Sequence, residues 1–375
     1  MAGQAQPVTR FVMLGGFLGA GKTTALLRVA REYTEAGKLV GIITNDQAEG
    51  LVDTETFRAQ GFDTEEIPKG CFCCKFDELV AAAGRLADGH EPDVLLAEPV
   101  GSCTDLVATV INPLKRLYAD RFCVAPYVAL LDPERAYSAL TGTGRAGFSA
   151  KVTYIYKMQQ NEADVVAINK ADTLSPERLQ ELTELVQRNF PKADVIAISA
   201  RTGQGFDRLS RILDGAGEAG ANPAVVDYDV YAEGEALLGW LNATVDLASR
   251  ESFDADRFLL ALADRIREGL ADSGAEPAHV KILLRCGDVV AIANLVRGDQ
   301  GPELSRRCDR RVNSGQLTIN ARVEVAPDVL RERVEQALEA VTGDYGLSVD
   351  VRSFESLAPP RPVPTHRTKK GVGSL

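Results

Sequence analysis

The chain of 375 residues is long enough for two domains, each with its own hydrophobic core. Its formal net charge of −11 argues against a general nucleic-acid binder, which needs a basic surface, and its composition of 45% hydrophobic and 25% charged residues is typical of a globular protein. No run of about 18 apolar residues is present. Residues 1–9 lack a signal-peptide pattern, so we expect a cytoplasmic protein with no membrane partner.

After residues 1–9, which we expect to be a flexible N-terminus, short apolar runs alternate with amphipathic helical patterns over residues 10–213. This alternation predicts βαβ units, and hence an α/β domain with a mostly parallel sheet covered on both faces. The expected strands are residues 11–14, 39–44, 94–97, 127–131, 165–169 and 195–199.

The first expected strand leads into a G-x-x-x-x-G-K-T sequence from Gly16 to Thr23, and a helix is expected over residues 24–33. Glycines at this spacing let backbone N–H groups surround a polyphosphate at the positive end of the helix. Lys22 is expected to reach the β- and γ-phosphates and Thr23 to ligate Mg²⁺. A turn that binds nothing is the alternative, but the strand and helix on either side favour a P-loop NTPase domain. The expected nucleotide-binding residues of this loop are Gly16, Gly19, Ala20, Gly21, Lys22, Thr23 and Thr24.

A cysteine cluster follows at Cys71, Cys73 and Cys74, with Lys69 and Lys75 beside it. Thiolates at this spacing can ligate one soft metal ion, and the lysines would favour the thiolate form. With three protein ligands the fourth position stays open, which suits a metal ion that must leave again. A redox pair between the outer cysteines and a set of small buried side chains are the alternatives.

The expected strand at residues 94–97 is followed by Glu98, a position that suits a carboxylate holding Mg²⁺ directly or through water. Gly101 could bring its backbone N–H to the γ-phosphate, so we count both with Lys22 and Thr23 as catalytic candidates. A solvent-facing acid is the alternative for Glu98. Cys103 is close enough in sequence to be a fourth metal ligand, although a buried bystander is favoured.

The sequence Asn169-Lys170-Ala171-Asp172 follows another expected strand. An aspartate there can accept hydrogen bonds from the ring N–H and the amine of guanine, which adenine does not offer, and such sites discriminate on the order of 10⁴-fold. Alone, this motif is as often a helix cap. Here it lies downstream of the phosphate loop, and Ser199 and Ala200 begin a segment similar to the loop that covers the base in GTP-binding proteins.

The Gly-, Ala- and Pro-containing residues 214–227 predict a linker. Residues 228–356 predict a smaller α+β domain, ferredoxin-like with an added strand, and the Pro-rich residues 357–375 an extended tail over the surface. The expected elements of this domain are a strand at 228–248, a helix at 254–272, a hairpin of 280–285 with 289–296, a strand at 317–325, a helix at 327–341 and a strand at 347–354.

Together these motifs resemble the CobW/HypB/UreG family of metallochaperone GTPases, and within it the CobW-like branch, whose G-C-x-C-C signature matches residues 70–74. The resemblance covers residues 10 to about 210, and more loosely the C-terminal domain. It implies GTP hydrolysis coupled to delivery of Zn²⁺ or Co²⁺ to a client protein or cofactor pathway. The cysteines of the signature would hold that ion next to the nucleotide.

The resemblance also implies roles in a switch segment, where Asp46 would lie near Mg²⁺ and the bound metal, and where Glu49 and Asp53 fall on acids of the family pattern. Two departures stand out. Pro99 follows Glu98 where the family has a threonine, so a hydroxyl is lost and the turn is stiffer. The chain also lacks the histidine-rich stretch of many relatives, which argues for metal transfer and against storage.

The resulting hypothesis is a slow, switch-like GTPase in which GTP·Mg²⁺ orders residues 45–53 and 98–105 and sets the cysteine loop for metal capture. No side chain stands out as a general base, so we expect hydrolysis to rely on positioning and charge, with stimulation by a partner or in a nucleotide-dependent homodimer. Two alternatives remain open: a GTPase chaperone for a corrinoid- or metal-dependent enzyme with no metal transport, and a P-loop phosphotransferase.

Overall fold

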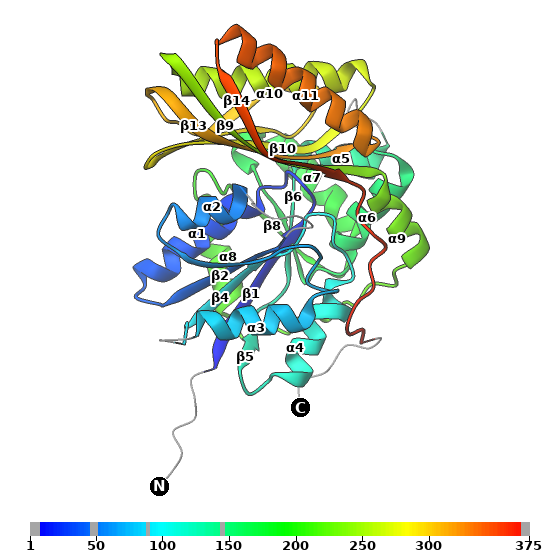
Figure 1. Ribbon diagram of the computed structural model, residues 1–375. Coiled ribbons are helices and arrows are strands. Elements are labelled where there is room, and N and C mark those ends of the chain that lie inside the picture. The colour runs from blue at the N-terminus through cyan, green and yellow to red at the C-terminus, as the bar shows by residue number, and fades with distance from the viewer. Residues whose placement is uncertain (1–7, 46–51, 88–90, 143–146, 369–375) are drawn as a thin grey trace.

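Two sheets, one parallel and one antiparallel, form the framework of the computed structural model, which describes residues 8–45, 52–87, 91–142 and 147–368 (Figure 1). The candidate positions Asp46 and Glu49 lie outside the described residues, as does most of the expected flexible N-terminus. Among the helices of the described ranges, none has both the length and the apolar character needed to span a bilayer.

The N-terminal domain is built on a sheet of strand order β3-β2-β4-β1-β6-β7-β8, with β5 beside β1, and every pairing is parallel. The predicted α/β class is therefore confirmed. The strands β3 and β5 escaped prediction because one is a polar edge strand and the other spans only three residues. The strands are β1 (Thr9–Gly16), β2 (Val40–Asn45), β3 (Asp63–Ile67), β4 (Val94–Glu98), β5 (Phe122–Val124), β6 (Val128–Leu131), β7 (Val165–Ile168) and β8 (Asp194–Ala197).

Helices cover both faces of this sheet because the central strand β1 is apolar on both sides. Phe11 and Met13 pack into the core on one face, and Val12 and Leu14 into the core on the other. The helical elements are α1 (Lys22–Glu35), α2 (Val52–Arg58), α3 (Phe76–Leu86), η1 (Val107–Ile111), α4 (Asn112–Leu117), α5 (Pro133–Thr141), α6 (Ala150–Asn161), η2 (Ala171–Thr173), α7 (Pro176–Asn189), α8 (Phe206–Asp214) and α9 (Tyr228–Ala236).

The C-terminal domain has an antiparallel sheet of order β12-β11-β10-β13-β9-β14. Its four strands β14-β9-β13-β10, connected through α10 and α11, have the ferredoxin-like βαββαβ arrangement, so that expectation is confirmed, with β11 and β12 as added strands. Both helices lie on the face turned away from the N-terminal domain (Figure 1). The elements are β9 (Leu238–Asp254), α10 (Ala255–Asp272), β10 (Glu276–Cys286), β11 (Val289–Leu295), β12 (Glu303–Arg306), β13 (Arg311–Glu324), α11 (Pro327–Asp344) and β14 (Ser348–Leu357).

The prediction of a strand over residues 228–248 is wrong for its first half, where the chain forms α9. The side chain of Asp227 accepts hydrogen bonds from the backbone N–H groups of Asp229 and Val230, which caps a helix at this point. The buried positions of this helix are Tyr231, Gly234 and Glu235, a helical spacing that the alternation of polar and apolar residues in the sequence concealed.

Gly16 offers a test of how the first strand meets the loop that follows it. Its φ is +122°, and a Cβ at this position would lie 2.2 Å from the Leu130 carbonyl oxygen of β6. Gly16→Ala is expected to lower the free energy of unfolding by about 3 kcal/mol or more, measured by urea unfolding. Gly84→Ala is the control, because no described atom lies within 4 Å of its Cβ position in α3, and equal stability of the two variants would contradict the prediction.

Candidate functional site

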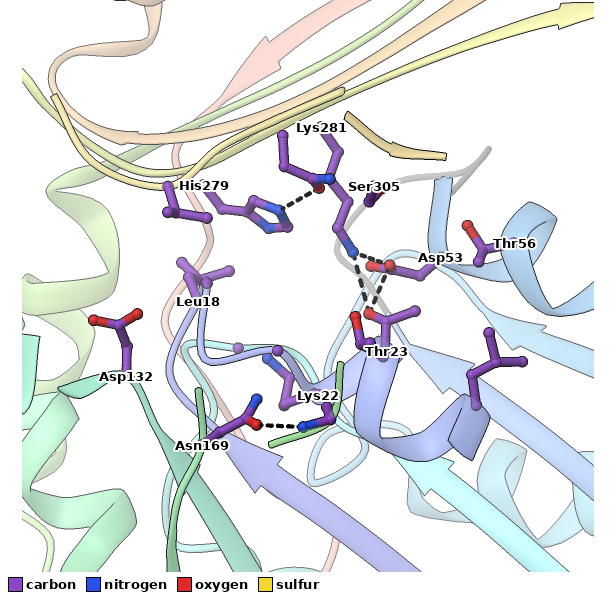
Figure 2. Close-up of a pocket in the computed structure, with 18 of the residues that line it drawn as sticks. Leu18, Lys22, Thr23, Asp53, Thr56, Asp132, Asn169, His279, Lys281 and Ser305 are labelled. Carbon is purple, nitrogen blue, oxygen red and sulfur yellow. Dashed lines mark hydrogen bonds and ion pairs between the residues drawn. The ribbon is translucent and has the colours of Figure 1, made fainter. Parts of the chain in front are cut away.

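A cavity of about 1040 Å³ lies where the carboxyl ends of the parallel strands meet the C-terminal sheet (Figure 2). Most of the predicted nucleotide residues line it, whereas Gly16, Ala20 and Ser199 are buried behind its wall. The predicted residues that line it are Gly19, Gly21, Lys22, Thr23, Thr24, Glu98, Gly101, Asn169, Lys170, Asp172 and Ala200.

Side-chain oxygens converge around Thr23 in this cavity. The Thr23 hydroxyl lies 2.8 Å from Asp53 Oδ1 and 3.0 Å from Glu98 Oε1. The second Glu98 oxygen, Oε2, is buried and has no hydrogen-bond partner among the described residues. A hydroxyl and two carboxylates are the hard oxygen donors that Mg²⁺ prefers, so this donor set fits a magnesium ion.

Cationic side chains balance these acids. Burial lowers the pKa of Lys22, whose Nζ lies 3.4 Å from the Phe17 carbonyl oxygen. Burial alone would raise the pKa of Asp53, but the Lys281 ammonium beside it lowers that pKa to about 2. Burial and then the negative charge of Asp53 raise the pKa of Glu98 to about 7. The site therefore holds one firmly ionised acid and one that a bound cation would help to ionise.

Asn169 joins three motifs that are far apart in sequence. Its Nδ2 donates to the Ala20 carbonyl oxygen at 2.8 Å, and its Oδ1 accepts from the Ala200 backbone N–H at 2.9 Å. A Cβ at Gly21, where φ is +89°, would lie 2.4 Å from Asn169 Nδ2. Lys170 adds a hydrogen bond of 3.1 Å to the Gly19 carbonyl oxygen. The predicted phosphate loop and base-reading segments are thus held as one unit.

The Asp172 carboxylate lies at the cavity wall and forms an ion pair with Arg201. Its pKa is lowered, first by a hydrogen bond with the Ser199 hydroxyl and then by Arg201. Because the Arg201 side chain is 70% exposed, this ion pair contributes little stability and can open. Asp172 is therefore an ionised acceptor that a ligand with paired N–H donors can reach.

The predicted metal ligands form a second site. The sulfur atoms of Cys71, Cys73 and Cys74 all lie within 4.8 Å of one another, with Cys74 Sγ at 3.3 Å from Cys71 Sγ. Cys71 and Cys73 are buried and Cys74 is half-buried. Three sulfur donors at this separation fit a soft, thiophilic ion such as Zn²⁺.

Cys71 is the thiol of this cluster that ionises most readily. Its pKa is lowered well below the usual value by hydrogen bonds from Cys103, Cys73 and Cys74, in that order. The pKa of Cys74 is raised to about 11, first by its hydrogen bond to Cys71. Cys103, favoured as a bystander from the sequence, is buried in the same core cluster as Cys71 and Cys73, but it is not one of the three sulfurs that lie within 4.8 Å of one another. A metal ion would replace the shared protons of these thiols.

Asn45, at the end of β2, ties the cysteine loop to the parallel sheet. Its Nδ2 donates to the carbonyl oxygens of Ile67 and Gly70 at 2.9 and 2.5 Å, and its Oδ1 accepts from the Phe72 backbone N–H at 2.8 Å. Asn45 also immediately precedes residues 46–51, the part of the predicted switch segment outside the described ranges. One side chain therefore ties the end of β2 to the loop that carries the thiols.

The turn after β4 also connects the two sites. Glu98 faces Thr23 in the cavity, and Cys103, five residues later, is buried in the same core cluster as Cys71 and Cys73. Gln159 Nε2 donates to the carbonyl oxygens of Gly101 and Cys103, both at 2.9 Å, and a Cβ on Gly101 would lie 2.7 Å from Leu18 of the phosphate loop. The turn is buried and packed throughout, so a shift at one end must move the other.

The C-terminal tail is extended, as predicted, but it docks on the cysteine loop. The Val363 backbone N–H donates to Cys74 Sγ at 3.2 Å, and the Thr365 backbone N–H donates to the Cys73 carbonyl oxygen at 2.8 Å. Arg367 forms an ion pair of 2.7 Å with the buried Asp105 carboxylate. The tail therefore covers the half-buried side of the thiol cluster.

Several cavity residues were not predicted from the sequence: Asp132, His279 and Lys281. Asp132 comes directly after β6, and Glu98 is the last residue of β4. Both therefore lie at the same edge of the sheet, and this position could have suggested Asp132 as a cavity residue. His279 and Lys281 alternate with apolar residues on β10, which indicates that one face of that strand meets a polar partner. Nothing in the sequence says that the partner is the N-terminal domain.

Comparisons with known proteins give one family. The model of the CobW/HypB/UreG nucleotide-binding domain matches residues 10–197. The zinc chaperone YeiR of Escherichia coli (strain K12) is 29% identical over 189 residues, which cover 48% of this chain and 52% of YeiR. The zinc chaperone CobW of Pseudomonas aeruginosa is 28% identical over 232 residues, covering 52% of this chain and 56% of that protein.

The chain thus spans about half the length of the curated relatives it matches. Among solved structures, the Zn(II)-bound YjiA GTPase from E. coli aligns over 89% of this chain and 99% of its own, with 17% sequence identity and a TM-score of 0.39.

Removal of residues 362–375 is expected to speed the reaction of Cys74 with a thiol reagent such as DTNB by at least about tenfold, because the tail covers this sulfur. The measurement uses a Cys123→Ser background, since Cys123 is exposed and would react first. Arg361 and its ion pair with Asp229 remain in the truncated chain. An unchanged rate of Cys74 labelling would show that the tail does not shield it.

Proposed function

The chain belongs to the CobW/HypB/UreG family, and on that premise we propose that it is a GTP-hydrolysing metallochaperone that captures Zn²⁺ at its thiol cluster and delivers it to a client protein. The relatives named as zinc chaperones support zinc as the cargo. Co²⁺ is the second candidate, because thiolate ligands accept both ions.

Guanine nucleotide would bind in the cavity, with the backbone of the phosphate loop and Lys22 on the phosphates and Asp172 on the base. Thr23, Glu98 and Asp53 would hold Mg²⁺, together with Asp46 and Glu49 as the family resemblance implies. Bound Mg²⁺ supplies charge neutralisation on the phosphates. The chain itself contributes positioning through Asn169 and the packed Gly101 turn, since no described side chain in the cavity stands out as a general base.

The single observation that supports the coupling is the buried segment from Glu98 to Cys103, in which Glu98 accepts a hydrogen bond from Thr23 and Cys103 packs in the same core cluster as Cys71 and Cys73. A nucleotide that moves the Glu98 carboxylate therefore has a short, packed route to the metal ligands. Asn45 supplies a second route. Coupling through such elements typically amounts to about 1–3 kcal/mol, which is a 5- to 150-fold change in metal affinity.

Asp172→Ala is expected to weaken binding of GDP by roughly 10²–10⁴-fold, the value of two hydrogen bonds to a charged acceptor, and to remove the preference for GDP over ADP. Binding of fluorescent GDP and ADP measures both effects. Glu177→Ala is the control, an exposed acid at the start of α7 that does not line the cavity. A variant that still prefers GDP would contradict the assignment of Asp172 to the base.

The affinity for Zn²⁺ is expected to be about 5- to 150-fold higher with a non-hydrolysable GTP analogue than with GDP, measured by competition with a chromophoric chelator. Cys73→Ser and Cys74→Ser should each abolish this difference, because each removes a thiolate ligand. Cys123→Ser, which changes an exposed cysteine outside the cluster, should preserve it. Equal affinities in the two nucleotide states would end the coupling proposal.

A further inference from the structure

The sheet of the C-terminal domain presents a polar face to the N-terminal domain. Along β10, Val280, Ile282 and Leu284 pack into the core of their own domain beneath α10 and α11. The alternate residues therefore lie on the opposite face of the pleated strand. These alternate residues are His279, Lys281, Leu283 and Arg285.

This face holds α2, the first helix after residues 46–51. Asn320 Oδ1 of β13 accepts from the Val52 backbone N–H at 2.9 Å, and Val52 packs against Leu283 in a small apolar cluster. Further along α2, Arg285 forms an ion pair with Glu55. The first turn of α2 therefore contacts the second domain through Val52 and Glu55.

Lys281 makes a different kind of contact, because it reaches past α2 into the cavity (Figure 2). Its ammonium forms an ion pair with Asp53 and a hydrogen bond of 3.1 Å with the Thr23 hydroxyl. Its side chain is only 13% exposed. Arg285 and Glu55, by contrast, do not line the cavity. A lysine from the second domain thus occupies the position between a P-loop hydroxyl and an acid, where a divalent cation would bind.

We propose that Lys281 is a phosphate-site residue supplied by the C-terminal domain, whose ammonium lies between Thr23 and Asp53 and contacts the terminal phosphate when Mg²⁺·GTP is bound. The proposal rests on the proposed GTPase function and gives the C-terminal domain a part in it. Because Thr23 and Asp53 would also hold Mg²⁺, binding of that ion would move the Lys281 ammonium away from their oxygens. The incoming polyphosphate is then the nearest new anion, and the flexible lysine stem can follow it.

This arrangement places a second cation beside Lys22 without the help of another subunit. In phosphoryl transfer such a cation stabilises charge that develops on the transferred group, and it is commonly supplied by a separate element or protein. It also distinguishes GTP from GDP, since only GTP carries the terminal phosphate. The same movement would release Asp53 of α2 from the C-terminal sheet.

The test compares Lys281→Met, Lys281→Arg and Arg285→Met in the full-length protein. Dissociation constants are measured with fluorescent GDP and with a fluorescent non-hydrolysable GTP analogue, both with Mg²⁺. Lys281→Met should weaken analogue binding about 10- to 100-fold, the range of one charge-assisted hydrogen bond, with GDP binding within about threefold of wild type. Lys281→Arg should restore most of the loss. Arg285→Met, which removes an ion pair between the domains outside the cavity, should leave both constants within about threefold of wild type.

The rate of GTP hydrolysis by Lys281→Met should fall together with its affinity for the GTP analogue. Circular dichroism and gel filtration report whether each variant is folded. Equal weakening of both nucleotides by Lys281→Met would overturn the proposal, since that result means Lys281 only holds α2. Unchanged analogue binding would overturn it as well. Failure of the proposed function itself is distinguishable, because the wild-type protein would then bind neither guanine nucleotide.

Discussion

The parallel register of three neighbouring strands fixes how close the two candidate sites are. Thr44 of β2 pairs with Glu98 of β4, and Met13 of β1 pairs with Ala97, so the three strands end side by side. The phosphate loop, the cysteine loop held by Asn45 and the turn that reaches Cys103 therefore begin at one edge. Within the described residues, the sheet therefore sets the spacing of the two candidate sites, and the chemistry of both depends on it.

The second constraint on the cavity is that its buried positive and negative charges must balance. Buried acids and buried lysines stabilise one another there, and the removal of either sign alone would leave an uncompensated charge at considerable cost. Asp53 is the shared member, because it touches Thr23 of the P-loop and Lys281 of the other domain. The two domains are thus joined at the same atoms on which a metal–nucleotide complex would act, so occupancy of the cavity and domain arrangement are linked properties.

The sequence was sufficient to predict motifs whose arrangement follows from the local spacing of their residues. The predicted phosphate loop and base-reading segment line the cavity and the predicted thiols lie together, because the local spacing of these residues fixes their positions, and the alternation of strands and helices identified the parallel sheet. It was insufficient where contacts join distant segments. Lys281 reaches Asp53 only through the packing of one domain on the other, and the contact of Cys103 with Cys71 depends on how two loops are stacked. The helix α9 was not predicted because its polar and apolar residues alternate as in a strand, although Asp227 caps a helix at this point.

The C-terminal tail, which contacts the cysteine loop, bears on the proposed delivery of the metal ion. Val363 and Thr365 satisfy hydrogen-bonding groups of the thiol loop on its more accessible side, as an extended peptide from another protein could. Under the proposed function, a protein that accepts the ion from Cys74 would have to displace this segment. Under the proposed function, the tail would compete with a recipient protein for the cysteine loop, and delivery of the ion would require the recipient to displace it.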